Sequence, residues 1–351
     1  AVLVIDAVDG VRPLTRRIWN AVREAGLPSF VFINKMDRDR ADFDMAFSGA
    51  VVLLGITLID YLIMCLAGSP LDMMISPRAT QEAVAMKAQQ LGLDQPVLVQ
   101  YLSWLGQLFQ GNLGYSYKSY QPVAEMIGSQ MAPTLLLMGV SLVLGLLIAV
   151  PAGIYSAIHR YQKRDFAVVT ASFFGSSIPG FFLALILIYV FNVRLGWLPS
   201  SGMFTPGTGG DFWDVVRHLI MPAVVLAVSV AGSNIRYIRS AMLEILEMDY
   251  LRTAKAKGIG RFLVINKHAL RNALLPIVTV IGMQIPTLFG GAVIIEQIFS
   301  WPGLGLVTMN AITGRDYPVI MGVCLLSAVV VQVSNLLTDI VYALVDPTIK
   351  Y

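Results

Sequence analysis

Residues 249–276 carry small and basic side chains at spacings that suit contact with another protein. Leu251, Ala254 and Gly258 follow one another at intervals of three and four residues, so a helix places them on one face. Asp249 is the predicted N-cap and Gly258 the predicted C-terminal stop. A helix this short is marginal in water, because isolated helices need roughly 12–15 residues. The pattern therefore predicts a docking helix whose small side chains let a partner approach closely and whose basic side chains pair with acidic groups.

Side chains that perform catalysis or bind metals form no recognisable pattern in this sequence. The three histidines, at positions 159, 218 and 268, lack ligand-like spacing. Cys65 and Cys324 fall in apolar segments, where cysteine behaves as a small buried hydrophobic residue. No HExxH, Ser-His-Asp or Walker A pattern occurs, and no paired carboxylates stand in a predicted cleft. We expect a non-catalytic chain without a metal or a cofactor of its own.

The composition is that of a membrane protein. Of the 351 residues, 56% are hydrophobic and only 13% are charged, whereas soluble domains carry about 25% charged residues. The mean hydropathy is +0.70. The net charge of +3 is too small to favour nucleic-acid binding, and the first 45 residues lack the apolar region of a signal peptide. We expect an all-α protein that crosses the lipid bilayer several times.

Six apolar stretches approach or exceed the 20 or so residues that a bilayer requires. They are residues 45–66, 133–157, 166–191, 219–241, 273–299 and 318–344. Asp60 interrupts the first span, so it either faces a cavity or protein partner or lies near the outer edge. Pro179, Pro222 and Pro286 lie within spans or at their ends, which membrane helices tolerate when neighbouring groups satisfy the freed carbonyls.

Lysine and arginine predict the orientation of these spans, because they accumulate in cytoplasmic loops. Loop 158–165 has three basic residues and loop 242–272 has six, whereas the opposite loops, 192–218 and 300–317, hold only three between them. Loops 158–165 and 242–272 are therefore predicted to be cytoplasmic, together with both termini. Residues 67–131 are then external.

The external region contains two predicted helices. An amphipathic helix covers about residues 76–91, opened by Pro77 and closed by Gly92. A second helix runs near residues 96–109. The region as a whole does not span the membrane.

Residues 1–45 have a different character, because they predict a strand, a helix over residues 15–25 and a second strand. Asn34, Lys35 and Asp37 match the NKxD motif that reads guanine, and the stretch resembles a piece of the G domain of translation elongation factor G. A GTPase also needs a GxxxxGK[ST] phosphate loop, and the chain has none. We interpret residues 1–45 as a non-functional or artefactual fragment. A membrane-tethered GTP-binding protein is the remote alternative.

From about residue 45 to its end, the chain resembles permease subunits of bacterial ABC importers, most closely the B-type subunit of the dipeptide, oligopeptide and nickel group. Residues 253–258 (TAKAKG), followed by Leu275 and Pro276, match the EAA motif of this family, with Thr253 in place of the usual glutamate. The other matching segments are RATQEAVAMKAQQLGLDQPVLVQYLSWL, HALRNALLPIVTV, EQIFSWPGLGLVTMNAITGRDYP and YALVDPTIKY. The resemblance implies that residues 46–351 form a type I importer permease with six transmembrane helices, located in the inner membrane.

The resemblance also implies a role for the segment described first, as a coupling helix that docks on a cytoplasmic ATPase. The implied coupling residues are Leu251, Arg252, Thr253, Ala254, Lys255, Ala256, Lys257, Gly258 and Pro276. In the alternative, the basic residues only determine topology. The implied partners are a second homologous permease, two ABC ATPases that bind ATP and magnesium, and an extracytoplasmic substrate-binding protein. Short peptides are the expected substrate, with nickel chelates or oligosaccharides as alternatives. A channel or secondary transporter would need no coupling helix.

The translocation path should be lined by small and polar residues of the spans. The candidates are Ser176, Ser177, Ser233, Asn234 and Gln284. Polar residues in spans also hold helices together, so substrate contact is only one of their two expected roles.

The outer segment 300–318 supplies candidates for an external gate or a contact with the binding protein. Trp301 is expected as an interfacial anchor, Pro302 and Gly303 form a turn, and Arg315 and Asp316 form a local pair. The alternative is a structured re-entrant turn between two spans. For residues 67–131, docking of the binding protein and simple folding over the translocation mouth remain equal alternatives.

Overall fold

The chain divides into two compact units in the computed structural model. They are Ala1–Leu54 with Thr348–Tyr351, and Gly55–Pro347. The structure describes residues 2–6, 30–34, 41–74, 80–207, 210–256, 258, 260, 263, 277–278, 282, 284–285, 288–289 and 292–345.

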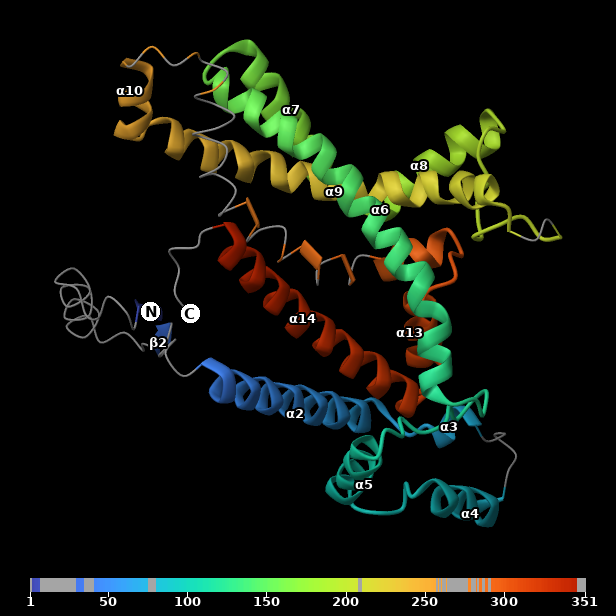
Figure 1. Ribbon diagram of the computed structural model, residues 1–351. Helices are drawn as coiled ribbons and strands as arrows, with labels where there is room; N and C mark the ends of the chain where they lie inside the picture. Colours follow the sequence, from blue (N-terminus) through green and yellow to red (C-terminus); the bar gives the residue numbers. More distant parts are fainter. Residues whose placement is uncertain are drawn as a thin grey trace. The chain divides into compact units, whose positions relative to one another are not determined.

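The first unit contains two parallel strands, β1 (Val2–Asp6) and β2 (Phe30–Asn34), of which β2 is labelled in Figure 1. They pair in register from Val2 opposite Phe30 to Asp6 opposite Asn34. Both strands were predicted from their apolar runs. The predicted helix 15–25 and the motif residues Lys35 and Asp37 lie outside the described residues.

The predicted first span, residues 45–66, lies within the helix α2 (Ala41–Ala67), inside which the boundary between the two units falls. α2 carries Asp60, whose carboxyl group interacts with the Cys324 thiol of α14 (Tyr317–Val345). Of the two alternatives for Asp60, the structure therefore supports a partner within the protein.

Two long helices, α6 (Val123–Ile158) and α9 (Phe212–Leu246), pack along each other in the second unit. Glycine makes the close contact possible: a Cβ atom on Gly145 would lie 2.6 Å from Val230, and one on Gly153 would lie 2.8 Å from Ile238. Small residues at such positions are typical of membrane helix interfaces. Both helices contain proline, as the sequence predicted for Pro222 of α9.

The predicted span over residues 166–191 is broken by a sharp bend. The structure has α7 (Lys163–Ser177), then α8 (Gly180–Leu187) continued by the π-helical turn η2 (Ile188–Arg194), with a bend of 94° between the two parts. α7 and α8 point in different directions in Figure 1. The cause is Pro179, which lacks an N–H donor and forces the residue before it out of the helical region. Ile178 is accordingly extended, with ψ at 121°.

Among the described residues, α6, α9 and α14 are each long and apolar enough to cross a membrane, and the bent pair can supply a fourth span. Most of the predicted span 273–299, including Pro286, lies outside the described residues, but residues 292–298 are helical. α14 agrees closely with the predicted span 318–344.

The region 67–131, predicted to be external, contains α3 (Leu71–Met74), α4 (Gln81–Leu91) and α5 (Val97–Phe109). α4 begins after Thr80, whose hydroxyl accepts a hydrogen bond from Ala83 N as an N-cap. The predicted start at residue 76 falls outside the described residues. Gly92 closes α4 in a left-handed conformation, as predicted.

The final two elements are short. α10 (Asp249–Ala256) follows α9 almost directly, and α13 (Leu304–Thr313) precedes α14. Asp249 is the first helical residue of α10 and not its cap, so that prediction was wrong. Its carboxylate still suits the first turn, where the helix dipole is positive. Gly258 has φ at +78°, the conformation expected after a helix end.

Candidate functional site

α10 is attached to the helix bundle through Leu251. This side chain is fully buried and packs in a cluster with Ile238 and Met242 of α9 and Ala157 of α6. The prediction that Leu251 belongs to an accessible contact face was therefore wrong, because burial makes it the anchor of α10. Burying a leucine stabilises the attachment by about 1.5–3 kcal/mol.

The accessible part of the segment includes Thr253 and Gly258, which are both exposed. Thr253 Oγ1 donates to Asp249 O at 3.1 Å, a bond inside the helix that leaves the methyl group and the hydroxyl oxygen for other contacts. The helix also contains Arg252, Ala254, Lys255 and Ala256, whereas Lys257 and Pro276 lie outside the described residues.

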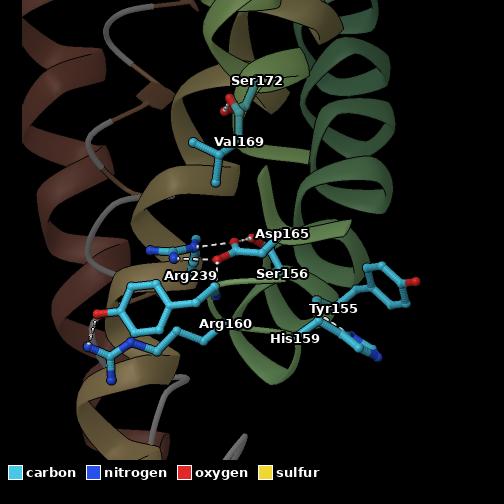
Figure 2. A network of polar contacts seen from close by, with 9 residues as sticks. Tyr155, Ser156, His159, Arg160, Asp165, Val169, Ser172 and Arg239 are labelled. Atoms are coloured by element: carbon cyan, nitrogen blue, oxygen red, sulfur yellow. Dashed lines mark hydrogen bonds and ion pairs between the residues drawn. The ribbon is translucent and has the colours of Figure 1, made fainter. Parts of the chain in front are cut away.

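A buried carboxylate joins α6, α7 and α9 (Figure 2). Asp165, in the first turn of α7, is 4% exposed. Arg239 of α9 donates to it from Nε and Nη2, both at 2.7 Å, which is a charge-assisted bidentate contact. Ser156 Oγ of α6 donates to the same group, and Tyr161 N does so at 2.9 Å. One side chain therefore ties α6, α7 and α9 together.

The loop before α7 also reaches the start of α10. Arg160 forms an ion pair with Glu247, which lies between α9 and α10. Its guanidinium also donates to Tyr161 Oη at 2.9 Å and lies 4.7 Å from the ring centroid. Hydrogen bonding to Glu247 raises the pKa of Arg160. Both charged side chains are largely exposed, so the pair contributes little stability by itself.

Two of the residues predicted to line the translocation path form side-chain hydrogen bonds to backbone carbonyls of their own helix, α9. Asn234 is 1% exposed, and its Nδ2 donates to Val230 O at 2.7 Å. The prediction of Asn234 as a path-lining residue was therefore wrong for this arrangement. Ser233 is half-buried and donates to Val230 O and Ser229 O.

The other candidates are accessible. Ser176 and Ser177 are exposed at the end of α7, and Gln284 is half-buried. Arg236 of α9 donates to Ser176 Oγ at 2.9 Å, and its guanidinium lies 4.6 Å from the Phe173 ring centroid. Sequence reasoning missed Arg236 as a site residue, although an ionisable residue within a span is a signal of function.

The outer turn is organised by a second buried acid that sequence reasoning also missed. Glu296 is fully buried and accepts hydrogen bonds from Thr134 Oγ1 of α6 and from Gly305 N, both at 2.6 Å. It thereby satisfies the amino end of α13. A Cβ atom on Gly303 would lie 2.4 Å from its carboxylate, so this contact requires glycine. An acid inside the apolar run 292–299 was the available signal.

Trp301 is not the interfacial anchor that was predicted. It is fully buried, and its Nε1 donates to Pro133 O of α6 at 3.0 Å. Pro302 follows it in non-helical backbone, and Gly303 is extended before α13 begins.

The predicted local pair of Arg315 and Asp316 was also wrong. Arg315 Nη1 contacts Asp72 Oδ2 at 2.5 Å, whereas Asp316 accepts hydrogen bonds from Ser116 Oγ and from Tyr117 N. Burial raises the pKa of Tyr117 to about 12, and the Asp316 carboxylate adds to the increase. Both charged residues therefore fasten segment 300–318 to the region 67–131.

Two family models match the sequence. One, described as "Binding-protein-dependent transport system inner membrane component", matches residues 149–351. The other, described as "Binding-prot-dependent transport system membrane comp, N-term", matches residues 43–138. Residues 1–42 fall outside both models.

Curated relatives match along almost their whole length. A putative peptide permease protein of Brucella ovis is 47% identical over 306 residues, which cover 86% of this chain and 96% of the relative. The oligopeptide transport system permease protein AppB of Bacillus subtilis is 46% identical over 302 residues, with the same coverage. The glutathione transport system permease protein GsiC of Escherichia coli is 39% identical over 286 residues, which cover 82% of this chain and 90% of the relative.

A solved structure of the MetNI methionine ABC transporter, in an inward-facing conformation, has a similar fold. The TM-score is 0.53 at 22% sequence identity, and the match covers 63% of this chain and 96% of that chain. This likeness supports the predicted type I importer permease fold.

Proposed function

The chain belongs to the family of inner membrane components of binding-protein-dependent transport systems, and we propose that it conducts short peptides as a permease subunit of an ATP-driven importer. The peptide class rests on the relatives described above, which are named as peptide, oligopeptide and glutathione permeases. Glutathione is itself a short peptide, so the three names point to one kind of substrate.

The attachment of α10 is the observation that carries the coupling role. Leu251 fixes the helix to the bundle, while Thr253 and Gly258 remain exposed for a partner. Displacement of α10 by a partner would be passed to α9 through the buried leucine. The contact of Arg239 with Asp165 would then carry the movement from α9 to α6 and α7.

The partners follow from this role. Two cytoplasmic ATPases would bind ATP and magnesium and supply hydrolysis, so that this chain is a non-catalytic subunit. A second permease would complete the path, and an extracytoplasmic binding protein would deliver the peptide. Both termini, with loops 158–165 and 242–272, would lie on the cytoplasmic side, in keeping with the distribution of basic residues.

Arg236 would supply the translocation path with a positive charge that can bind the carboxyl end of a peptide. It lies ten residues from the end of α9, which is about 15 Å along the helix, beside the exposed Ser176. A guanidinium binds a carboxylate through planar paired hydrogen bonds, so Arg236 would attract the carboxyl end of the passing peptide.

Substitution of Gly258 by leucine tests the coupling role. Gly258 is exposed, and a Cβ atom there would meet nothing within 4 Å in this chain, so the added side chain would disturb a partner and not the bundle. We expect the variant to enter the membrane normally but to lose peptide uptake and peptide-stimulated ATP hydrolysis in proteoliposomes that contain the assembled importer.

Gly111→Leu is the matched control. Gly111 has φ at +77°, against +78° for Gly258, and its Cβ would also lie in open space, but it belongs to the external region. It introduces the same backbone strain without touching α10, so uptake should persist. Uptake and stimulated hydrolysis at wild-type levels in Gly258→Leu would contradict the coupling role.

A further inference from the structure

α5 presents three faces of different chemistry. At the helical angle of about 100° per residue, one face carries Tyr101, Trp104, Leu105 and Leu108, the second Gln100, Ser103 and Gln107, and the third Leu98, Leu102 and Phe109. The first face is packed: Tyr101 is buried, and Trp104 and Leu105 join it in a cluster with Tyr61 and Tyr317. The second face lines a cavity of about 470 Å³.

The third face is apolar and open. Leu98, Leu102 and Phe109 are 62%, 54% and 79% exposed. This stripe lies on the opposite side of α5 from the polar residues that line the cavity. A helix with one polar face and one apolar face is typical of segments that lie in a membrane interface.

The contacts of α5 place it beside the membrane-spanning part of α2. Tyr101 Oη lies 3.0 Å from Thr57 Oγ1, and its ring centroid lies 5.8 Å from that of Tyr61. Thr57 is ten residues before Ala67, the last residue of α2, which is about 15 Å along an α-helix. Tyr101 is therefore at a level well inside the outer end of this span.

The start of α14 marks the same outer edge independently. Tyr317, its first residue, donates a hydrogen bond to Met64 O of α2. The ends of two spans thus coincide near Met64, and Thr57 lies deeper than both. The exposed side chains of α2 near this depth include Ile59 and Leu62, whose apolar character suits contact with hydrocarbon.

Charge separates α5 from its neighbour α4 in the same external region. α5 contains no Asp, Glu, Lys or Arg, whereas α4 carries Glu82 and Lys87 and has no buried residue. A charged side chain in hydrocarbon costs several kcal/mol, so α4 must remain in water. No charged residue of α5 opposes burial of its apolar face in lipid.

We propose that α5 is inserted in the outer leaflet of the bilayer, with Leu98, Leu102 and Phe109 among the acyl chains and its polar face toward the cavity. The external region is then anchored to the membrane by α5, while α4 stands in water. The packed face holds α5 against α2 and α14, so the anchor is fixed to two spans. This inference goes beyond the proposed transport function and does not depend on the substrate.

Nitroxide labels test the proposal in the full chain, assembled with its partners and reconstituted in phosphatidylcholine bilayers. Cys65→Ala and Cys324→Ser first remove the native thiols, and a label is then attached at Leu98→Cys or Leu102→Cys. Met86→Cys on α4 is the matched control, because Met86 and Leu98 are both 62% exposed. Molecular oxygen concentrates in lipid, whereas chromium oxalate stays in water. We expect oxygen to increase the relaxation rate of the α5 labels several-fold more than chromium oxalate does. At the Met86 label, chromium oxalate should have the larger effect.

Two results would overturn the proposal. Labels on α5 that chromium oxalate reaches as readily as the Met86 label would place the helix in water. Labels shielded from both reagents would mean that a protein surface covers it.

A second measurement uses the chain without substitutions. Phosphatidylcholine with a photoreactive diazirine in its acyl chain should form adducts on peptides of α5 and α2 and none on α4. Labelling of α2 without labelling of α5 would refute the insertion even if the cysteine variants failed to assemble.

Discussion

Replacement of Asp165 by asparagine should loosen the joint between α6, α7 and α9 near the coupling segment. The carboxylate accepts four hydrogen bonds, two from Arg239, one from Ser156 and one from Tyr161. Asparagine keeps the shape but removes the charge and turns an NH₂ group toward these donors. Breaking a buried ion pair by changing one partner costs about 3–5 kcal/mol. The Arg239 side chain is 23% exposed, so water can partly solvate the charge that is left. We therefore expect the free energy of unfolding to fall by about 3 kcal/mol, the lower end of this range.

Glu247→Gln provides the control from the neighbouring ion pair. Arg160 and Glu247 are 39% and 63% exposed, so this substitution should cost about 0–1 kcal/mol. Thermal unfolding of the assembled importer in detergent should therefore show a clearly lower midpoint for Asp165→Asn than for Glu247→Gln. In proteoliposomes, Asp165→Asn should also lower the amount of peptide taken up per ATP hydrolysed, since α9 would move without carrying α6 and α7.

A double-mutant cycle with Arg239→Gln isolates the contact itself. Residues that share a hydrogen-bonded network show interaction energies of about 0.5–3 kcal/mol, and this pair should lie in the upper half of that range. Equal unfolding midpoints for Asp165→Asn and Glu247→Gln, or fully additive effects in the cycle, would refute the reasoning.

Two further predictions concern the outer turn and the path. Gly303→Ala forces a methyl group against the Glu296 carboxylate and should lower the yield of folded chain in detergent chromatography. Gly128→Ala is the control, because nothing lies within 4 Å of its Cβ, and it should not change the yield. Equal yields for the two variants would contradict the contact between Gly303 and Glu296. Arg236→Gln should reduce uptake of a peptide with a free carboxyl end more than uptake of its amidated form, and an equal reduction of both would argue against carboxylate binding by Arg236.

The elements of this fold were largely predictable from local patterns. α5 begins one residue after the predicted start, and α14 differs from the predicted span by one residue at each end. Long apolar runs predict spans, and residues such as Gly92 predict helix ends, from the local sequence alone. These predictions do not require knowledge of which other segments pack nearby. The bend at Pro179 had a visible cause, but tolerance of a proline depends on groups that lie elsewhere, and Pro222 in α9 causes no such break.

The contacts of the site were less predictable because they depend on which helices meet. Arg315 and Asp316 are adjacent in the sequence and of opposite charge, yet their partners lie 243 and 200 residues away. Leu251 had the spacing of a contact face, and the structure uses it for attachment. Local spacing shows which residues share a face of a helix, but not which surface that face meets.

Acidic residues that interrupt apolar or basic segments indicate contacts between segments that are distant in the sequence. Asp60 contacts Cys324 on another span, Asp165 contacts Arg239, and Glu296 contacts Thr134. An acid that is costly in lipid persists only where another segment supplies donors. Such residues therefore identify the places along a sequence where two segments must pack, although only the fold reveals the partner.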